Sequence, residues 1–180
     1  MSNLSVKRLK LLATTKPWNI VRAIEELGDS IYPHDSEVAV VESRRYKTLI
    51  YIYSVIDARR LFRLVVSEPP AYVERIVPVE KIIPGGLGEA VEYVVSVIGK
   101  HSSNSLNVEV KPRGIFIKGD EKHVAASVAK LLAMQGIRVR RHADKVVKIE
   151  DTEYGIVVAF MDNGSDRLKY WRRRRLGVLI

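Results

Sequence analysis

The stretch Leu106-Asn107-Val108-Glu109-Val110-Lys111-Pro112-Arg113-Gly114 places apolar side chains at every second position over its first six residues and then breaks the pattern. Strict alternation of this kind is typical of a strand with one buried face, and the glycine indicates a turn after it. Residues 115–118 resume the alternation and predict a further short strand. Asp120 can then cap a helix whose buried stripe consists of Val124, Val128, Leu131 and Leu132.

The same signals extend to both sides of this strand and helix. Upstream, a glycine-rich loop at residues 84–88 precedes a helix with apolar residues from Leu87 to Ile98. Downstream, three β-rich runs predict strands at residues 137–141, 145–150 and 155–161. The second half of the chain is therefore predicted to mix helices with a sheet.

The first half of the chain predicts an independent α/β arrangement. Pro17 suits the first turn of its first helix, Gly28 suits that helix's end, and Asp57 can cap the second. The order strand, helix, strand, strand, helix is most of a ferredoxin-like unit. Residues 73–83 supply either its fourth strand or a linker. The predicted strands are 9–15, 38–42 and 48–54, and the helices are 17–27 and 57–68.

Three segments of the second half resemble the THUMP domain. They are residues 75–80 (RIVPVE), residues 108–114 (VEVKPRG) before a helix rich in Val and Ala, and residues 136–139 (GIRV) leading into residues 146–150 (VVKIE). The first half resembles the ferredoxin-like domain that precedes THUMP in tRNA-modifying proteins. The chain as a whole is most similar to stand-alone THUMP proteins that act as tRNA adaptors for cytidine N4-acetylation. This resemblance implies binding at the acceptor end of tRNA.

We therefore predict an α+β fold in which an N-terminal ferredoxin-like unit is followed by a THUMP-like α/β unit. The predicted boundaries are residues 1–70 for the first unit, 71–165 for the second, and 166–180 for a basic C-terminal segment.

Charge points to the class of partner. The 180 residues carry 30 Lys/Arg against 21 Asp/Glu, a formal net charge of +9, which favours a polyanion. The alternative is that the charge only keeps the protein in solution. Residues 165–180 carry six Lys/Arg against one acidic residue, so over half of the excess lies there.

The candidate RNA-binding residues form three groups, each with a simpler alternative. Lys111, Arg113, Gly114 and Lys118 could grip phosphate beside a turn, or end a solvated strand. Arg138 and Arg140 share a strand face, with Arg141 next to them. This face could follow an RNA backbone, or it is a polar outer face, since Glu150 and Asp151 follow. Arg172, Arg173, Arg174 and Arg175, flanked by Tyr170 and Trp171, could stack on and pair with RNA, or form a charged tail.

Two further basic groups are interpreted as ordinary solvated surface. Arg59, Arg60 and Arg63 lie on one side of a predicted helix, which needs a polar face. Arg44, Arg45 and Lys47 lie in a hairpin connection.

No catalytic residue, metal site or cofactor is predicted. The chain has no Cys, and its four His residues lack metal-binding spacing. Gly85, Gly86 and Gly88 match neither a Walker A loop nor GxGxxG, so they are interpreted as a loop. With no apolar run of about 18 residues, no membrane span is predicted, and a cytoplasmic location is expected.

The expected function is capture and positioning of tRNA for a separate tRNA-modifying enzyme, the second expected partner. The alternatives are a protein-binding scaffold and, third, an enzyme acting on RNA. The sequence does not specify the oligomeric state.

Overall fold

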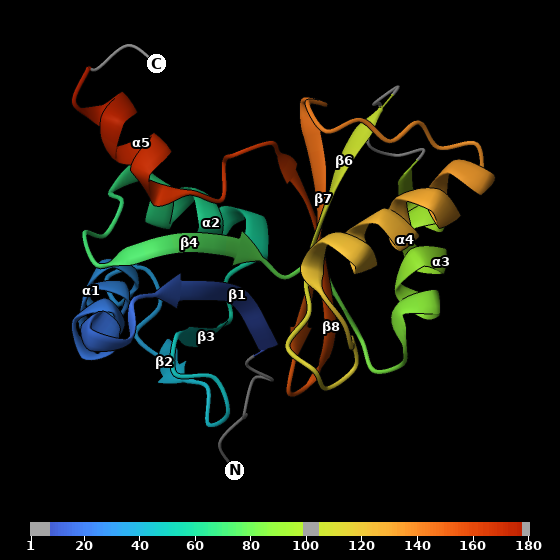
Figure 1. Ribbon diagram of the computed structural model, residues 1–180. Helices are drawn as coiled ribbons and strands as arrows, with labels where there is room; N and C mark the ends of the chain where they lie inside the picture. Colours follow the sequence, from blue (N-terminus) through green and yellow to red (C-terminus); the bar gives the residue numbers. More distant parts are fainter. Residues whose placement is uncertain (1–7, 99–104, 178–180) are drawn as a thin grey trace. The chain divides into compact units, whose positions relative to one another are not determined.

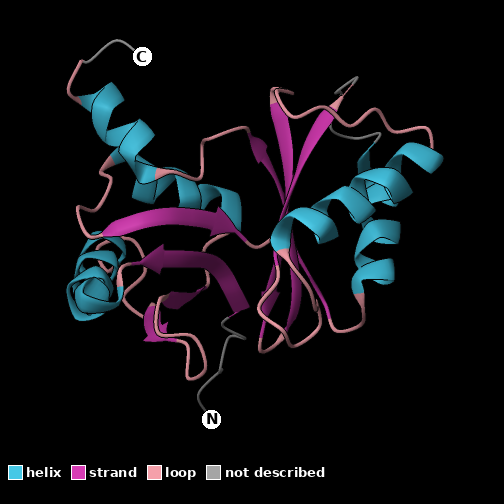
Figure 2. Cartoon of the chain, viewed as in Figure 1, coloured by secondary structure: helices cyan, strands magenta, loops and turns pink. Residues whose placement is uncertain are grey.

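The computed structural model describes residues 8–98 and 105–177, which form two compact units. The first unit comprises residues 1–79 and 164–180, and the second comprises residues 80–163 (Figure 1). Both units combine helices with a four-stranded sheet (Figure 2), so the predicted α+β class is confirmed.

The first unit has the ferredoxin-like arrangement. Its sheet has the order β2-β3-β1-β4, and every neighbouring pair is antiparallel. This is the strand order of a β-α-β-β-α-β unit. Its elements are β1 (Arg8–Thr15), the 3₁₀ turn η1 (Pro17–Asn19), α1 (Ile20–Ile31), β2 (Ala39–Glu42), β3 (Leu49–Ser54), α2 (Ala58–Ser67), β4 (Val73–Pro78) and α5 (Leu168–Arg175).

Local signals account for the start of α2 but not for the end of α1. The Asp57 carboxylate accepts hydrogen bonds from the backbone N–H groups of Arg59 and Arg60, which confirms the predicted cap of α2. The sequence predicts that α1 ends at Gly28. This prediction is wrong, because the helix continues to Ile31. Ile31 is fully buried, and its burial outweighs the cost of a helical glycine, about 1 kcal/mol.

The second unit is a mixed sheet with two helices. The sheet order is β5-β8-β7-β6, in which β6 and β7 are parallel and the other pairs antiparallel. Asp120 caps α4 through the N–H groups of Lys122 and His123, as predicted. Its elements are β5 (Lys81–Ile83), α3 (Leu87–Ile98), β6 (Leu106–Lys111), α4 (Glu121–Met134), β7 (Lys145–Thr152) and β8 (Gly155–Asp162).

Each unit has its own core. In the first, Leu11, Ile52 and Leu61 are fully buried among residues of the sheet and its helices. In the second, alternate residues of β6 pack with the inner faces of α3 and α4, as the alternation predicts.

The boundaries of the units differ from the predicted ones at 70/71 and 165/166. Residues 73–78 form β4, which pairs with β1 and so belongs to the first sheet. Residues 81–83 form β5 and join the second sheet. The C-terminal segment returns to the first unit, where a bridge joins Arg167 to Arg75 and covers the edge of β4.

Two predicted strands also differ. Residues 115–118 form no strand: residues 115–117 are bends whose N–H groups bond to a side chain described below. Residues 137–141 contribute only the bridge between Val139 and Leu106.

Candidate nucleic-acid interface

The loop after β6 is wound around one buried carboxylate. Asp151 on β7 is fully buried, and its side chain accepts hydrogen bonds from the backbone N–H groups of four loop residues at 2.9–3.2 Å. The donors are Arg113, Ile115, Phe116 and Ile117. A carboxylate that satisfies four backbone donors holds the loop in one conformation.

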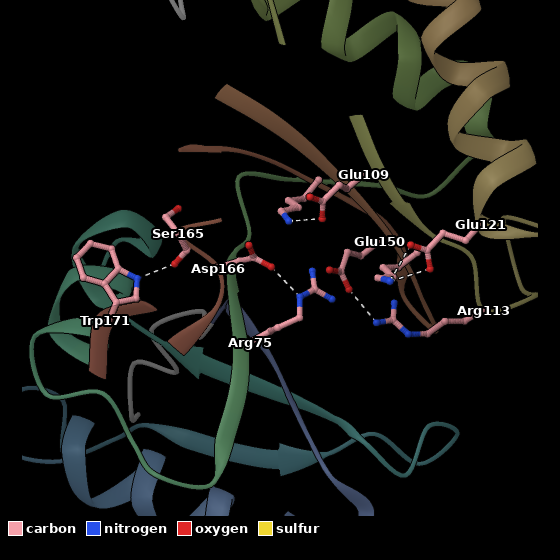
Figure 3. Close-up of polar contacts among 10 residues, drawn as sticks. Arg75, Glu109, Arg113, Glu121, Glu150, Ser165, Asp166 and Trp171 are labelled. Atoms are coloured by element: carbon pink, nitrogen blue, oxygen red, sulfur yellow. Dashed lines mark hydrogen bonds and ion pairs between the residues drawn. The ribbon is translucent and has the colours of Figure 1, made fainter. Parts of the chain in front are cut away.

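Arg113 strengthens the same arrangement with its side chain. Its guanidinium donates to the Asp151 carbonyl oxygen at 2.6 Å. It also donates to the Glu150 carboxylate at 2.8 Å (Figure 3). The Arg113 side chain is 16% exposed and that of Glu150 only 2%. The structure therefore places Glu150 and Asp151 inside the second unit, whereas their sequence position suggested a polar outer face.

The remaining residues of this group face solvent to different extents. The Lys111 ammonium pairs with the Glu121 carboxylate at 2.7 Å, and both side chains remain partly exposed. Gly114 is exposed and has a φ of +87°, in the region that favours glycine. Nothing lies within 4 Å of the position that a Cβ would occupy there. Lys118 is exposed at the loop's end.

The second group lies at the other end of β6. The Arg138 carbonyl and the Arg140 N–H both bond to Leu106, the first residue of β6. Arg138, Arg140 and Arg141 are exposed, while Val139 packs on the core. The five residue-to-residue steps from Leu106 to Lys111 span about 17 Å, at roughly 3.3 Å per step. The structure therefore does not bring the Lys111 and Arg138 groups together.

Two lysines near the second group are engaged within the unit. Lys148 is buried and pairs with Glu109 across the parallel β6–β7 pair. Lys145 pairs with Asp162 at 2.5 Å. Arg138, Arg140 and Arg141, in contrast, form no ion pair with any other residue in the described part of the chain, so they are available to an external anion.

The third group, Arg172 to Arg175, lies on helix α5, which packs on the first unit. Leu168 is fully buried, and the Trp171 indole N–H donates to the Ser165 carbonyl at 2.6 Å (Figure 3). The Arg172 guanidinium donates to the carbonyl oxygens of Pro70 and Val73. Its burial lowers the pKa of that guanidinium below the ordinary value. Arg173, Arg174 and Arg175 remain exposed.

The net charge is divided unevenly between the units. The first unit's sequence has 18 Lys/Arg against 10 Asp/Glu, or +8, and the second unit's has 12 against 11, or +1. The C-terminal segment accounts for +5 of the first unit's excess.

Two observations bear on other kinds of site. Within residues 8–98 and 105–177, no group of three or more His, Asp or Glu side chains is arranged to hold a metal ion. None of the described helices has the length and apolarity needed to cross a membrane.

The chain matches no family model and no curated protein. It does match solved structures. PH1313 from Pyrococcus horikoshii superposes with a TM-score of 0.64 and 11% identity, over 86% of this chain and 54% of that one. TrmN from Thermus thermophilus superposes with a TM-score of 0.58 and 16% identity, over 93% of this chain and 48% of that one. A 4-thiouridine synthetase, solved as a complex with RNA and bound ATP, superposes with a TM-score of 0.55 and 13% identity, over 86% of this chain and 41% of that one.

This chain spans about half the length of those structures. At such low identities the likeness concerns the fold. The structure is a ferredoxin-like unit followed by a THUMP-like α/β unit.

Proposed function

We propose that this chain binds tRNA and acts as an adaptor that positions tRNA for a separate modifying enzyme. The observation that carries the proposal is the fold, which is shared with a 4-thiouridine synthetase solved in complex with RNA. The tRNA ligand and the adaptor role rest on the THUMP resemblance of residues 108–114 and 136–150.

The second unit offers RNA two kinds of contact. The loop fixed by Asp151 presents Lys118 and the open backbone at Gly114. Exposed cations and accessible backbone are the groups that contact phosphate and sugar. At the other end of β6, which spans about 17 Å from Leu106 to Lys111 at roughly 3.3 Å per residue step, Arg138 and Arg140 present guanidinium groups. Two cationic sites at this spacing would bind different phosphates of one RNA, so affinity would depend on the RNA's shape.

Arg113 and Arg172 have a different role in this proposal. Both guanidinium groups already donate to groups of the protein, so they position the loop and α5. The contacts with RNA then fall mainly to Lys118, Arg138, Arg140, Arg141 and the exposed arginines of α5.

Competition binding tests the ligand. Labelled tRNA is bound to the purified chain and displaced with intact tRNA, with tRNA lacking its acceptor stem, and with polyuridylate. We expect intact tRNA to compete best. Equal competition by all three RNAs would contradict selective tRNA binding.

Turnover tests the adaptor role. The chain is incubated with tRNA and either an acetyl or a methyl donor, and the nucleosides are then analysed. We expect no new nucleoside from the chain alone. A donor-dependent product would instead support the enzyme alternative.

A protein-binding scaffold is the second candidate, because an apolar groove lies between α3 and α4. Its volume is about 400 Å³, and its lining includes Leu131 and Met134, which are 43% and 72% exposed. Exposed apolar side chains that line one groove are typical of a surface that binds another protein. An absence of tRNA binding at low salt would favour this candidate.

A further inference from the structure

The C-terminal helix α5 is fixed on the first unit by contacts of three kinds. Leu168 enters the core, and Arg172 donates to two backbone carbonyls. The Trp171 ring meets the ring of Phe62 on α2 edge to face, with centroids 6.5 Å apart. Because Leu168, Trp171 and Arg172 all fix the helix on the first unit, its remaining side chains are presented in a defined arrangement.

The outward side of α5 is almost entirely cationic. With Leu168, Trp171 and Arg172 turned to the protein, the exposed residues include Lys169, Arg173 and Arg174. The Arg174 guanidinium lies over the Trp171 ring, 5.9 Å from its centroid, which restricts its freedom. Arg175 has a long, exposed ion pair with Glu68 at 3.8 Å.

The helix α2, which contacts α5, carries two more exposed arginines. Arg60 and Arg63 are exposed, and Arg63 follows Phe62, the residue that touches Trp171. Figure 1 shows α2 and α5 side by side on the first unit. We call this surface the α2–α5 face; its members are Arg60, Arg63, Lys169, Arg173 and Arg174.

Few acidic groups offset this charge. Along residues 57–68 and 167–177 the acidic residues are Asp57, which caps α2, and Glu68, which pairs with Arg175. Glu26 and Glu74 lie near Arg172, on the side of α5 that is turned to the protein, and Glu26 accepts from the N–H groups of Ala71 and Tyr72. The face therefore presents a local concentration of positive charge within the unit that carries +8. Surfaces of this kind attract polyanions.

We propose that the α2–α5 face is an RNA backbone-binding surface, separate from the loop and strand residues of the second unit. This inference rests on the proposed function, since it assigns part of the same RNA to the first unit. Four of its five cations are arginines, whose planar guanidinium groups match phosphate in bidentate geometry. Guanidinium groups pair with carboxylates as well, but Tyr170, which is 37% exposed on the same helix, adds an aromatic ring on which a base can stack, and this favours RNA over an acidic protein.

A pair of matched variants of the full chain tests this. One replaces Arg63, Arg173 and Arg174 with Gln on the α2–α5 face. The control replaces Arg44, Arg45 and Lys47 with Gln, which removes the same charge from exposed residues between β2 and β3. Affinity for a tRNA transcript and for polyglutamate is measured at 50 and 150 mM salt, with circular dichroism as the check of folding.

We expect the face variant to lose roughly 10- to 100-fold in tRNA affinity at 150 mM salt, and the control less than about threefold, because each lost phosphate contact removes a share of counterion release. A third variant with Lys at the same three positions keeps the charge and should stay within about fivefold of the parent. If the face variant fails to fold, the single replacement Arg173→Gln takes its place, and a tRNA affinity equal to that of the parent chain would then overturn the proposal.

Other results also overturn it. Equal losses in the face variant and the control would mean that only net charge matters. Equal loss of tRNA and polyglutamate binding would identify a surface for acidic proteins. If the parent chain does not bind tRNA at all, the proposed function itself fails. If the parent binds tRNA and the face variant binds equally well, only the α2–α5 proposal fails.

Discussion

Asp151 is the residue whose replacement most directly tests the architecture of the loop. Its Oδ2 accepts from the N–H groups of Arg113, Ile115 and Ile117, and its Oδ1 accepts from Phe116. Asp151→Asn preserves the shape but leaves one acceptor oxygen. With that oxygen at the Oδ2 position, three bonds survive as neutral bonds, and the new amide NH₂ faces the Phe116 N–H.

The structure sets the size of the effect. Changing three charge-assisted bonds to neutral ones costs about 1 kcal/mol each, and a buried donor without an acceptor costs about 1–3 kcal/mol. Relaxation of the loop recovers part of this sum. We therefore expect Asp151→Asn to lower the free energy of unfolding by about 3–5 kcal/mol, a large part of the 5–15 kcal/mol typical of a domain.

Urea unfolding followed by circular dichroism measures this loss, and hydrogen exchange at residues 113–117 locates it. The matched control is Glu92→Gln, which makes the same chemical change on the exposed side of α3 and should shift stability by less than about 0.5 kcal/mol. A loss below about 1 kcal/mol in Asp151→Asn, with the loop amides still protected, would refute the role assigned to this carboxylate.

The arginines should separate into those that bind RNA and those that hold the protein together. Arg138→Ala with Arg140→Ala should weaken tRNA binding by about 1–3 kcal/mol in a filter assay without changing the urea midpoint, and a destabilised double variant would contradict this. Arg113→Ala should cost about 2–4 kcal/mol of stability, because it removes the cation that pairs with the buried Glu150 carboxylate; an unchanged midpoint would count against it. Arg172→Met should loosen α5 and speed tryptic cleavage near Arg173, whereas unchanged cleavage would show that the carbonyl contacts do not hold the helix.

Local patterns predicted most elements of the fold. Alternation identified β6, and the two Asp caps identified where α2 and α4 begin. The sequence does not predict how residues 73–83 are divided, because one apolar run supplies strands to two different sheets. Which sheet a strand joins depends on pairing with distant residues, and periodicity carries no information about that pairing.

The candidate site was predictable as a set of cations but not as an arrangement. Glu150 and Asp151 look like ordinary polar residues at a strand's end, yet both are buried and bind a loop 34 to 38 residues away. The sequence likewise shows Arg172 to Arg175 as one run. In the structure these four arginines have two different environments. Arg172 donates to backbone carbonyls of the first unit, whereas Arg173, Arg174 and Arg175 are exposed on the docked helix.

Binding of tRNA across a range of salt concentrations tests the central claim most directly. Lys118, the three arginines at 138–141 and the five cations of the α2–α5 face are nine groups in all, and we expect about four to seven of them to contact phosphates and release counterions. The logarithm of the association constant should then fall with the logarithm of the salt concentration with a slope of roughly −3 to −6. Submicromolar binding at 50 mM salt with such a slope would agree with the proposed function. No measurable affinity for tRNA even at 50 mM salt would contradict it.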